Sequence, residues 1–427
     1  MNILAINPWI YDFAAYDFWL KPYGFLVMLT YLKNKKINID YFDCLEKKTI
    51  KGSYGRSKYF SVIVEKPPIY KDIPRYYKRY GKLLEEFKDF IKDKKPDYIL
   101  LSSSMTYWYL GIIEAIKILK EKFIGIPIIL GGTYASLCYE HAIKNTPTNY
   151  IFKNNELEKF FKFIGIEFSY KELYSTLVDY EDFYKNYEYV VLRTSWGCPF
   201  SCSYCAIKEL FSDFFRIDYQ KIIEFILKYV KKGIKNFVLY DDAFLYEKDY
   251  VKKLLKEIER LNLDIYFHTP NALHLRFLDE ETAYLLKKTG FVNPHFGLET
   301  LNPKLQKEWG DKVNQKDLLE GIGYLKKGGF KKGEFSVYLL LGYPGQDLEE
   351  LKKEAEFLNS LGVKISLSEF SPVPKTILFE KYKEEFFEPL LQNNSIFGAF
   401  KKENIKKFWE VKNYVRELNK KLVKENL

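Results

Sequence analysis

The chain has 427 residues, of which 47% are hydrophobic and 29% are charged, and these values predict a globular protein of about two or three domains. The net charge of +10 is spread over expected helices on which lysine and glutamate alternate, a pattern typical of solvated helix faces. No apolar run reaches the ~18 residues that a bilayer span needs, and the N-terminus does not resemble a signal peptide. A membrane location is therefore not expected, and a nucleic-acid partner is unexpected because no base-reading motif occurs.

The first 165 residues alternate short apolar segments with amphipathic ones. Helices are expected over residues 23–35 and 110–122. Strands are expected over residues 2–8, 38–44, 97–104, 126–132 and 149–153. Strands that alternate with helices predict a parallel, doubly wound sheet of the flavodoxin or Rossmann type.

Two stretches of the N-terminal half do not follow this alternation. Residues 45–80 are rich in tyrosine, proline and basic residues, and they either cap a site or form a surface excursion. Residues 166–188 are expected to connect the first domain to the next.

A second alternation of strands and helices covers residues 189–385. After a first strand that leads into a cysteine-rich loop, further strands are expected over residues 236–242, 264–270, 293–300, 334–342 and 364–372. The intervening helices are expected over residues 219–232, 248–261, 280–288, 315–327 and 348–361. Six such units predict a partial (β/α)6 barrel with its site at the C-terminal ends of the strands. Residues 386–427 are expected to form a C-terminal helical extension whose helix, over 403–426, carries an apolar stripe that docks onto the barrel.

The loop after the first barrel strand reads TSWGCPFSCSYC and contains Cys198, Cys202 and Cys205. Five cysteines in a chain of this length are no disulfide framework, which places the protein in the reducing cytoplasm, where clustered cysteines more often bind metal. Thiolates suit iron–sulfur clusters or zinc, and both usually take four ligands. Three ligands on a four-iron cluster leave one iron open for chemistry. The alternatives are a zinc site completed by a distant histidine and three unrelated cysteines.

This CxxxCxxC loop at the start of a six-unit βα domain resembles the radical S-adenosylmethionine (SAM) superfamily. The resemblance implies that Cys198, Cys202 and Cys205 bind a 4Fe-4S cluster whose open iron takes the amino and carboxylate groups of SAM. One electron then cleaves SAM, and the resulting 5′-deoxyadenosyl radical abstracts a hydrogen atom from the substrate. It also implies that Tyr204 lies beside the adenine.

Further motifs at the strand ends agree with this resemblance, which covers roughly residues 189–375. Asp241 and Asp242, in VLYDDAF, replace the more usual Gly-Gly-Glu of the family and are expected to meet the ammonium or ribose hydroxyls of SAM. Their alternative role is to cap a helix. Glu299, in GLET, is expected to bind SAM. Gly342, in LLLGYPG, either lets the backbone approach a ligand or makes the turn.

The N-terminal sheet resembles the cobalamin-binding domain of one subgroup of this superfamily. The resemblance implies that the loops after the third and fourth strands contact the nucleotide tail of cobalamin through Ser103, Ser104, Gly131, Gly132 and Thr133. No Asp-x-His-x-x-Gly motif occurs, so a histidine ligand to cobalt is not expected. The alternative is a flavodoxin-like domain without the cofactor.

These resemblances together imply a cobalamin-dependent radical SAM methyltransferase that acts on an unactivated carbon of a small-molecule or peptide substrate. Methylcobalamin would supply the methyl group, a second SAM would regenerate it, and a flavodoxin- or ferredoxin-type protein would supply the electron. One alternative is a radical rearrangement or dehydrogenation without methyl transfer. A second is a non-catalytic iron–sulfur or zinc module that transfers electrons or binds a partner.

Overall fold

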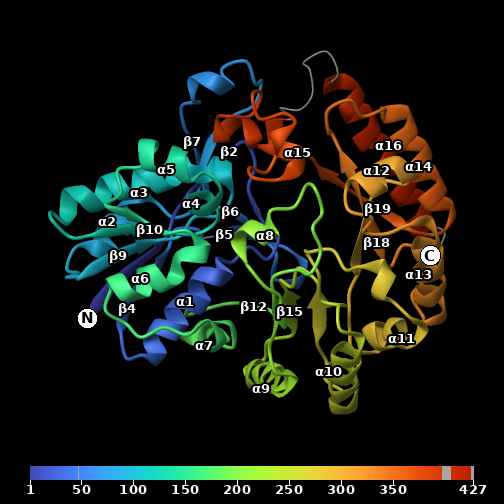
Figure 1. Cartoon of the computed structure of the whole chain (residues 1–427), viewed down its shortest axis with the longest axis horizontal. Helices are drawn as coiled ribbons and strands as arrows, with labels where there is room; N and C mark the ends of the chain where they lie inside the picture. Colours follow the sequence, from blue (N-terminus) through green and yellow to red (C-terminus); the bar gives the residue numbers. More distant parts are fainter. Residues whose placement is uncertain (47, 397–404, 425–427) are drawn as a thin grey trace. The chain divides into compact units, whose positions relative to one another are not determined.

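The structure is a computed structural model that describes residues 1–46, 48–396 and 405–424. The chain divides into two compact units (Figure 1). Unit 1 comprises Met1–Tyr187, Glu209–Ser212 and Tyr382–Ile396. Unit 2 comprises Glu188–Lys208, Asp213–Lys381 and Phe397–Leu427.

The division corrects two of the expected boundaries. The first unit extends to Tyr187, so residues 166–187 are part of it rather than a separate connection. Residues 386–396 also belong to unit 1 and not to a C-terminal extension. The reason is a set of buried polar contacts, in which the Tyr70 hydroxyl donates to the carbonyl of Leu390 at 2.6 Å and the Asn393 amide donates to Asp12 at 2.9 Å.

Unit 1 is built on a five-stranded parallel sheet. In the order β11-β10-β9-β1-β4, its strands are Tyr150–Ile151, Ile128–Leu130, Tyr98–Leu101, Asn2–Asn7 and Asn38–Asp43. This is the flavodoxin-type order, and it confirms the expected doubly wound sheet. From β1 the chain first adds β4 on one side and then β9 on the other side, so the order of strand addition reverses at β1. The C-terminal ends of β1 and β9 therefore form the switch point, which is where open α/β sheets bind ligands.

Helices cover both faces of this sheet because alternate strand residues are apolar and point to opposite sides. Leu4, Ile6, Ile99, Leu101 and Ile128 belong to one core cluster with side chains of α2, α3 and α5. The helices of unit 1 are α1 Tyr23–Asn34, α2 Leu84–Ile91, α3 Tyr109–Lys122, α4 Thr133–Leu137, α5 Tyr139–Asn145, α6 Leu157–Phe163 and α7 Tyr170–Tyr174.

The segment that the sequence left unplaced, residues 45–80, forms two small antiparallel sheets with strands from the N-terminal loop. One sheet has the order β3-β6-β5, from Tyr16–Asp17, Ser57–Tyr59 and Lys48–Lys51. The other has the order β2-β8-β7, from Ile10–Asp12, Lys78–Tyr80 and Ser61–Ile63.

Unit 2 is the expected partial (β/α)6 barrel. Its six parallel strands follow the chain order as β12 Tyr189–Leu192, β15 Asn236–Leu239, β16 Tyr266–His268, β17 His295–Glu299, β18 Ser336–Leu341 and β19 Lys364–Glu369. Two three-stranded groups meet between β16 and β17, where the Leu273 N–H donates to the carbonyl of His295 at 2.8 Å and a bridge pairs Leu273 with Phe296. A short antiparallel pair, β13 Ser195–Trp196 and β14 Phe215–Arg216, flanks the cysteine loop.

Amphipathic helices connect the barrel strands. They are α9 Tyr219–Val230, α10 Lys248–Leu261, α11 Glu280–Lys288, α12 Pro303–Glu308, α13 Gln315–Lys327 and α14 Leu348–Ser360 (Figure 1). Two short helices, α8 Ile207–Leu210 and α15 Ile377–Glu380, complete the connections. Among the described helices none is long and apolar enough to cross a bilayer.

The tail helix α16, Ile405–Lys424, packs on unit 2 as expected, and the ends of the predicted range 403–426 lie outside the described residues. Its apolar stripe is buried at Phe408, Val411 and Val415. The Asn419 amide continues the edge of the sheet, because it accepts from the Ile365 N–H at 2.9 Å and donates to the carbonyl of the same residue at 2.8 Å.

Candidate active site and cofactor-binding loops

The cysteine loop leaves β13 at the C-terminal end of the barrel. Gly197 follows β13 with a φ of +71°, a conformation that side chains disfavour, and it turns the chain into the loop. The Cys205 N–H donates to the carbonyl of Cys202 at 3.0 Å, which places these two residues on one turn. Cys198 and Cys202 are half-buried and Cys205 is exposed. Burial raises the pKa of the Cys198 thiol.

The middle of the loop is anchored by Phe200. Its ring stacks on His274 with centroids 4.9 Å apart and lies 5.6 Å from the ring of Phe277. Burial, together with the charges of Lys312 and Arg276, lowers the pKa of His274 to about 3, so its imidazole is neutral where it packs on Phe200.

The three thiols are of the residue type that binds iron–sulfur clusters. Within the part of the chain that the structure describes, no three His, Cys, Asp or Glu side chains converge on one point to hold a metal ion. A four-iron cluster does not require such convergence, because each thiolate binds a different iron.

Glu299 faces this loop from the end of β17. The pairing of β17 with β18 shifts register between Gly297 and Glu299, and Glu299 has a φ of +71°. Such backbone strain concentrates at functional positions. The Glu299 carboxylate accepts from the ammonium group of Lys312 at 3.2 Å, and both side chains are largely buried.

Lys312, which sequence reasoning missed, lies in the link between α12 and α13. Burial lowers its pKa, but the charges of Glu299, Cys202 and Cys205 outweigh burial, so the net shift is upward and the ammonium stays charged. A Cβ on Gly297 would lie 2.2 Å from the Lys312 Nζ. The glycine of the GLET motif therefore makes room for this lysine.

Two buried hydroxyls on the cysteine loop have no partner among the described residues. They belong to Ser203 and Tyr204. Burial and the charges of Glu299 and Cys202 raise the pKa of Tyr204, so the phenol is neutral. The ring of Tyr204 meets Trp309 edge-on with centroids 6.0 Å apart. A buried polar atom left without a partner in a native fold often marks a site for a bound group, and these two atoms fit a cofactor here.

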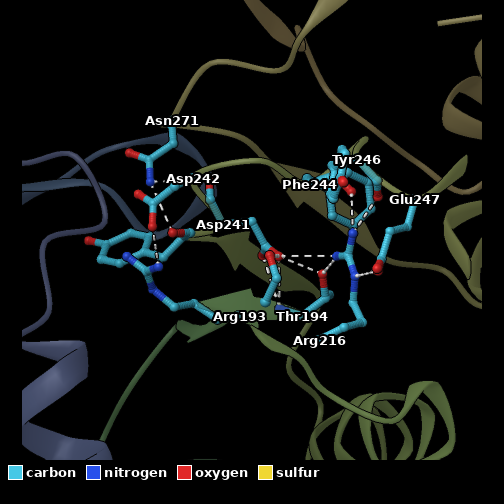
Figure 2. Close-up of polar contacts among 11 residues, drawn as sticks. Arg193, Thr194, Arg216, Asp241, Asp242, Phe244, Tyr246, Glu247 and Asn271 are labelled. Atoms are coloured by element: carbon cyan, nitrogen blue, oxygen red, sulfur yellow. Dashed lines mark hydrogen bonds and ion pairs between the residues drawn. The ribbon is translucent and has the colours of Figure 1, made fainter. Parts of the chain in front are cut away.

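Asp242 is paired with Arg193, as Figure 2 shows. Burial raises the pKa of Asp242 and the guanidinium only partly offsets this effect. The pKa of the Cys198 thiol is raised mainly by burial, and the nearby charge of the Asp242 carboxylate raises it further. The Arg193 guanidinium also lies 4.9 Å from the ring centroid of Trp196. Asp242 therefore flanks the cysteine loop.

Asp241, its neighbour, points away to a different set of partners. Its carboxylate accepts from the Thr194 N–H at 3.0 Å and from the Ser195 hydroxyl at 2.7 Å (Figure 2). The side chain is 1% exposed. The structure thus separates the two predicted aspartates, and only Asp242 is near the cysteines.

The predicted glycine at the end of β18, Gly342, has a φ of +96° and lies in a closed turn. Its N–H donates to the side chain of Gln346 at 2.6 Å, and the Gln346 amide donates back to the carbonyl of Leu340 at 2.8 Å. The motif therefore builds the turn itself, and the backbone donor of Gly342 is already used.

The predicted cobalamin loops of unit 1 lie side by side. The Ser103 hydroxyl donates to the carbonyl of Gly131 at 2.7 Å, and the Thr133 N–H donates to the carbonyl of Ser103 at 2.9 Å. Gly132 has a φ of +98°, and a Cβ there would lie 2.3 Å from the carbonyl oxygen of Ser103. Ser104 is exposed and, with Ser103, lines a small pocket at the switch point that also contains Asn7, Pro8, Trp9 and Trp108.

His141, the histidine of the N-terminal half, has both ring nitrogens engaged. Nδ1 lies 2.8 Å from the Tyr134 hydroxyl, and Nε2 lies 3.5 Å from the Glu388 carboxylate. The expected absence of a histidine ligand to cobalt stays a prediction.

Residues 192–358 match the family described as the Radical SAM superfamily. The matched range contains the cysteine loop, Asp242, Glu299 and Lys312. This range is a radical SAM domain.

Among curated proteins, the chain is 26% identical over 196 residues to the uncharacterized methyltransferase PH0819 of Pyrococcus horikoshii, covering 44% of this chain and 41% of that protein. It is 24% identical over 184 residues to the ribosomal protein uS12 methylthiotransferase RimO of a Hydrogenobaculum species, covering 40% of this chain and 44% of that protein. The chain thus spans less than half the length of these relatives.

Solved structures share the fold over both units. The radical SAM methyltransferase TsrM of Kitasatospora setae, with tryptophan and a SAM analogue bound, matches with a TM-score of 0.66 and 14% identity over 90% of this chain and 76% of that chain. The cobalamin-dependent radical SAM enzyme OxsB, with aqua-cobalamin and SAM bound, matches with a TM-score of 0.57 and 13% identity over 94% of this chain and 56% of that chain. At 13–14% identity, these two likenesses show that the chain shares its fold with both proteins.

Proposed function

We propose that the protein is a cobalamin-dependent radical SAM methyltransferase that transfers a methyl group to an unactivated carbon. The observation that carries the proposal is the placement of two ion pairs, Glu299–Lys312 and Asp242–Arg193, beside the three-cysteine loop. The match of residues 192–358 and the fold shared with TsrM and OxsB support it.

The charges of the two pairs suit the two ends of a zwitterion. The methionine part of SAM carries an ammonium and a carboxylate group, and the carboxylate of Asp242 suits the ammonium. The ammonium of Lys312 suits the carboxylate of SAM. The side chain of Glu299 is then left to bind the ribose hydroxyls of SAM. In the chain without ligand these groups satisfy each other, so binding exchanges internal ion pairs for ligand contacts and avoids an unpaired buried charge.

Cys198, Cys202 and Cys205 would hold a 4Fe-4S cluster, and such a cluster supplies the one-electron reductive cleavage of SAM. Tyr204 and Trp309 form an aromatic wall next to Cys202, which suits the adenine ring. Because one electron must enter from outside, an electron donor of the flavodoxin or ferredoxin type belongs to the proposal. The cysteines must be reduced for assembly, which suits the cytoplasm.

Cobalamin would be held by unit 1, and it supplies the methyl group when bound. The loops that carry Ser103 and Gly131–Thr133 lie at the C-terminal edge of the sheet, where ligands of open α/β sheets bind. Asn7 and Ser102 add polar side chains at the same edge. The Ser102 hydroxyl donates to the Asn7 side chain at 2.9 Å.

Three measurements on anaerobically reconstituted protein test the proposal in order. Reduction in the presence of SAM is expected to yield 5′-deoxyadenosine, and its absence would rule out radical SAM chemistry. Incubation with hydroxocobalamin is expected to leave a corrinoid absorption band after desalting, and a protein that shows only the absorption of its cluster would rule out the cobalamin step. With methyl-labelled SAM, product that lacks the label would favour a rearrangement or dehydrogenation.

A further inference from the structure

The cysteine loop is closed at its base by a short antiparallel pair. β13 and β14 pair Ser195 with Arg216 and Trp196 with Phe215. The Ile217 N–H also donates to the carbonyl of Thr194 at 2.9 Å. All residues from Gly197 to Phe214, which include the three cysteines, therefore leave from and return to one point.

The carboxylate of Asp241 fastens one side of this base. It accepts from the backbone N–H of Thr194 at 3.1 Å and 3.0 Å through its two oxygens, from the Thr194 hydroxyl and from the Ser195 hydroxyl (Figure 2). Thr194 and Ser195 are both 0% exposed, so water does not compete for these bonds.

The guanidinium of Arg216 fastens the other side. It donates to the Thr194 hydroxyl at 2.9 Å and to the backbone carbonyl of Tyr246, and it pairs with Glu247 at 3.1 Å (Figure 2). It lies 3.8 Å from the Asp241 carboxylate, and the ring of Tyr250 covers it at 4.5 Å. A single buried network thus joins the end of β15, the loop base and the start of α10.

We propose that Asp241 and Arg216 are positioning residues that hold the cysteine loop in the orientation that receives the cluster, and that Asp241 does not itself contact SAM. The inference rests on the proposed function only in taking Cys198, Cys202 and Cys205 as cluster ligands. Its reason is the use of the Asp241 carboxylate, whose oxygens are occupied by protein donors and shielded from solvent. Metal ligands are generally held by such outer partners.

Two substitutions remove the network from different sides. Asp241→Asn places an amide N–H₂ against donors and removes the negative charge beside Arg216. Thr194→Val removes the hydroxyl that both charged groups use, with little change in volume, so it serves if the asparagine variant does not fold. Asp12→Asn is the matched control, because Asp12 is also a buried carboxylate that accepts from several donors, including Trp108 at 2.8 Å, but it lies in unit 1.

The experiment measures iron retention and amide exchange. Reconstituted protein is challenged with an iron chelator at a temperature where every variant is folded. Asp241→Asn is expected to release iron at least tenfold faster than the unsubstituted protein, Thr194→Val several-fold faster, and Asp12→Asn at the original rate. The reduced cluster of Asp241→Asn is expected to show a heterogeneous EPR spectrum. In protein without iron, hydrogen exchange over residues 194–217 is expected to rise in Asp241→Asn but not in Asp12→Asn.

Two outcomes would overturn the inference. One is iron release and exchange in Asp241→Asn and Thr194→Val that equal those of the unsubstituted protein. The other is equal acceleration in Asp12→Asn, which would show general destabilisation. If the unsubstituted protein holds no cluster, the proposed function fails, and the exchange measurement on iron-free protein still decides whether Asp241 holds the loop.

Discussion

The ammonium group of Lys312 lies between Glu299 and the cysteine loop, so replacing it tests whether this point binds a carboxylate. Lys312→Met keeps most of the packing and removes the charge. A hydrogen bond to a charged group contributes about 1.5–3 kcal/mol, and 1.4 kcal/mol is tenfold in affinity. We therefore expect the Kd for SAM of the cluster-loaded protein to rise roughly 10- to 100-fold in equilibrium dialysis. Lys316→Met, at a side chain that is 79% exposed on α13, is the control and should leave the Kd unchanged.

Gly297 offers a second way to displace the same lysine. A Cβ at this position would lie 2.2 Å from Nζ and 2.8 Å from Cε of Lys312, and these atoms are the flexible end of a side chain. Gly297→Ala should therefore move the lysine and leave the backbone in place, with a loss in the free energy of unfolding no larger than that of Lys312→Met, which breaks the same ion pair. The Kd for SAM should rise as in Lys312→Met, and the double variant should bind no more weakly than either single one. Gly323→Ala, where a Cβ meets no atom within 4 Å, is the matched control. Additive effects in the double variant would contradict this coupling.

Apolar periodicity predicted the strands of both parallel sheets, the helices α1 and α3 of unit 1 and the main helices between the barrel strands, because each buries one face against a neighbour. It did not predict the shorter helices α2 and α4 to α7 of unit 1. It could not predict the small sheets of unit 1, since β2 pairs with β8 across almost seventy residues and each strand is only three residues long. The same limit applies to the site. Cys198 and Glu299 stand in recognisable motifs, but Lys312 is one of 67 lysines and arginines, and only the fold brings it to Glu299. Asp241 and Asp242 are adjacent in sequence, yet in the loop after β15 they take different partners, Thr194 for Asp241 and Arg193 for Asp242.

The pairing of β17 with β18 half-buries a titratable ring, that of His295. His295 stacks on Tyr338 with centroids 5.1 Å apart, and burial lowers the pKa of His295 to about 4. In the unfolded chain the pKa is about 6.5. As the pH falls below about 6.5 the unfolded chain takes up a proton that the folded chain refuses until about pH 4, so stability falls over this window. His295→Phe keeps the stacking and removes the proton site. Between pH 7.5 and 5.5 the unsubstituted iron-free protein should lose about 1.3 kcal/mol more of its free energy of unfolding in urea than His295→Phe does. Equal losses would contradict the burial of a neutral histidine.

Neither unit is one continuous stretch of chain. The backbone passes between units after residues 187, 208, 212, 381 and 396. Unit 1 depends on its last segment, because the buried Asp12 carboxylate accepts from Asn393 at 2.9 Å and from Ser395 at 3.1 Å. A fragment that ends at residue 187 would leave the buried Asp12 carboxylate without two of its donors and the Tyr70 hydroxyl without its acceptor on Leu390, at about 1–3 kcal/mol for each lost partner. Ligand assignments are therefore better tested in the full chain than in fragments.

Each unit has its own core and its own proposed cofactor, so the two should respond to different ligands in the full chain. A ligand that binds only the folded state stabilises it by RT ln(1 + [L]/Kd), which is about 2.7 kcal/mol at a concentration of 100 Kd. In anaerobic calorimetry, removal of iron and sulfide should lower one unfolding transition and leave the other unchanged. Hydroxocobalamin should raise the transition that iron removal leaves unchanged. Hydrogen exchange of β9 and β10 in unit 1, with and without hydroxocobalamin, assigns the transitions. Protection by hydroxocobalamin that is confined to unit 2 would contradict the placement of cobalamin on the loops of Ser103 and Gly131–Thr133.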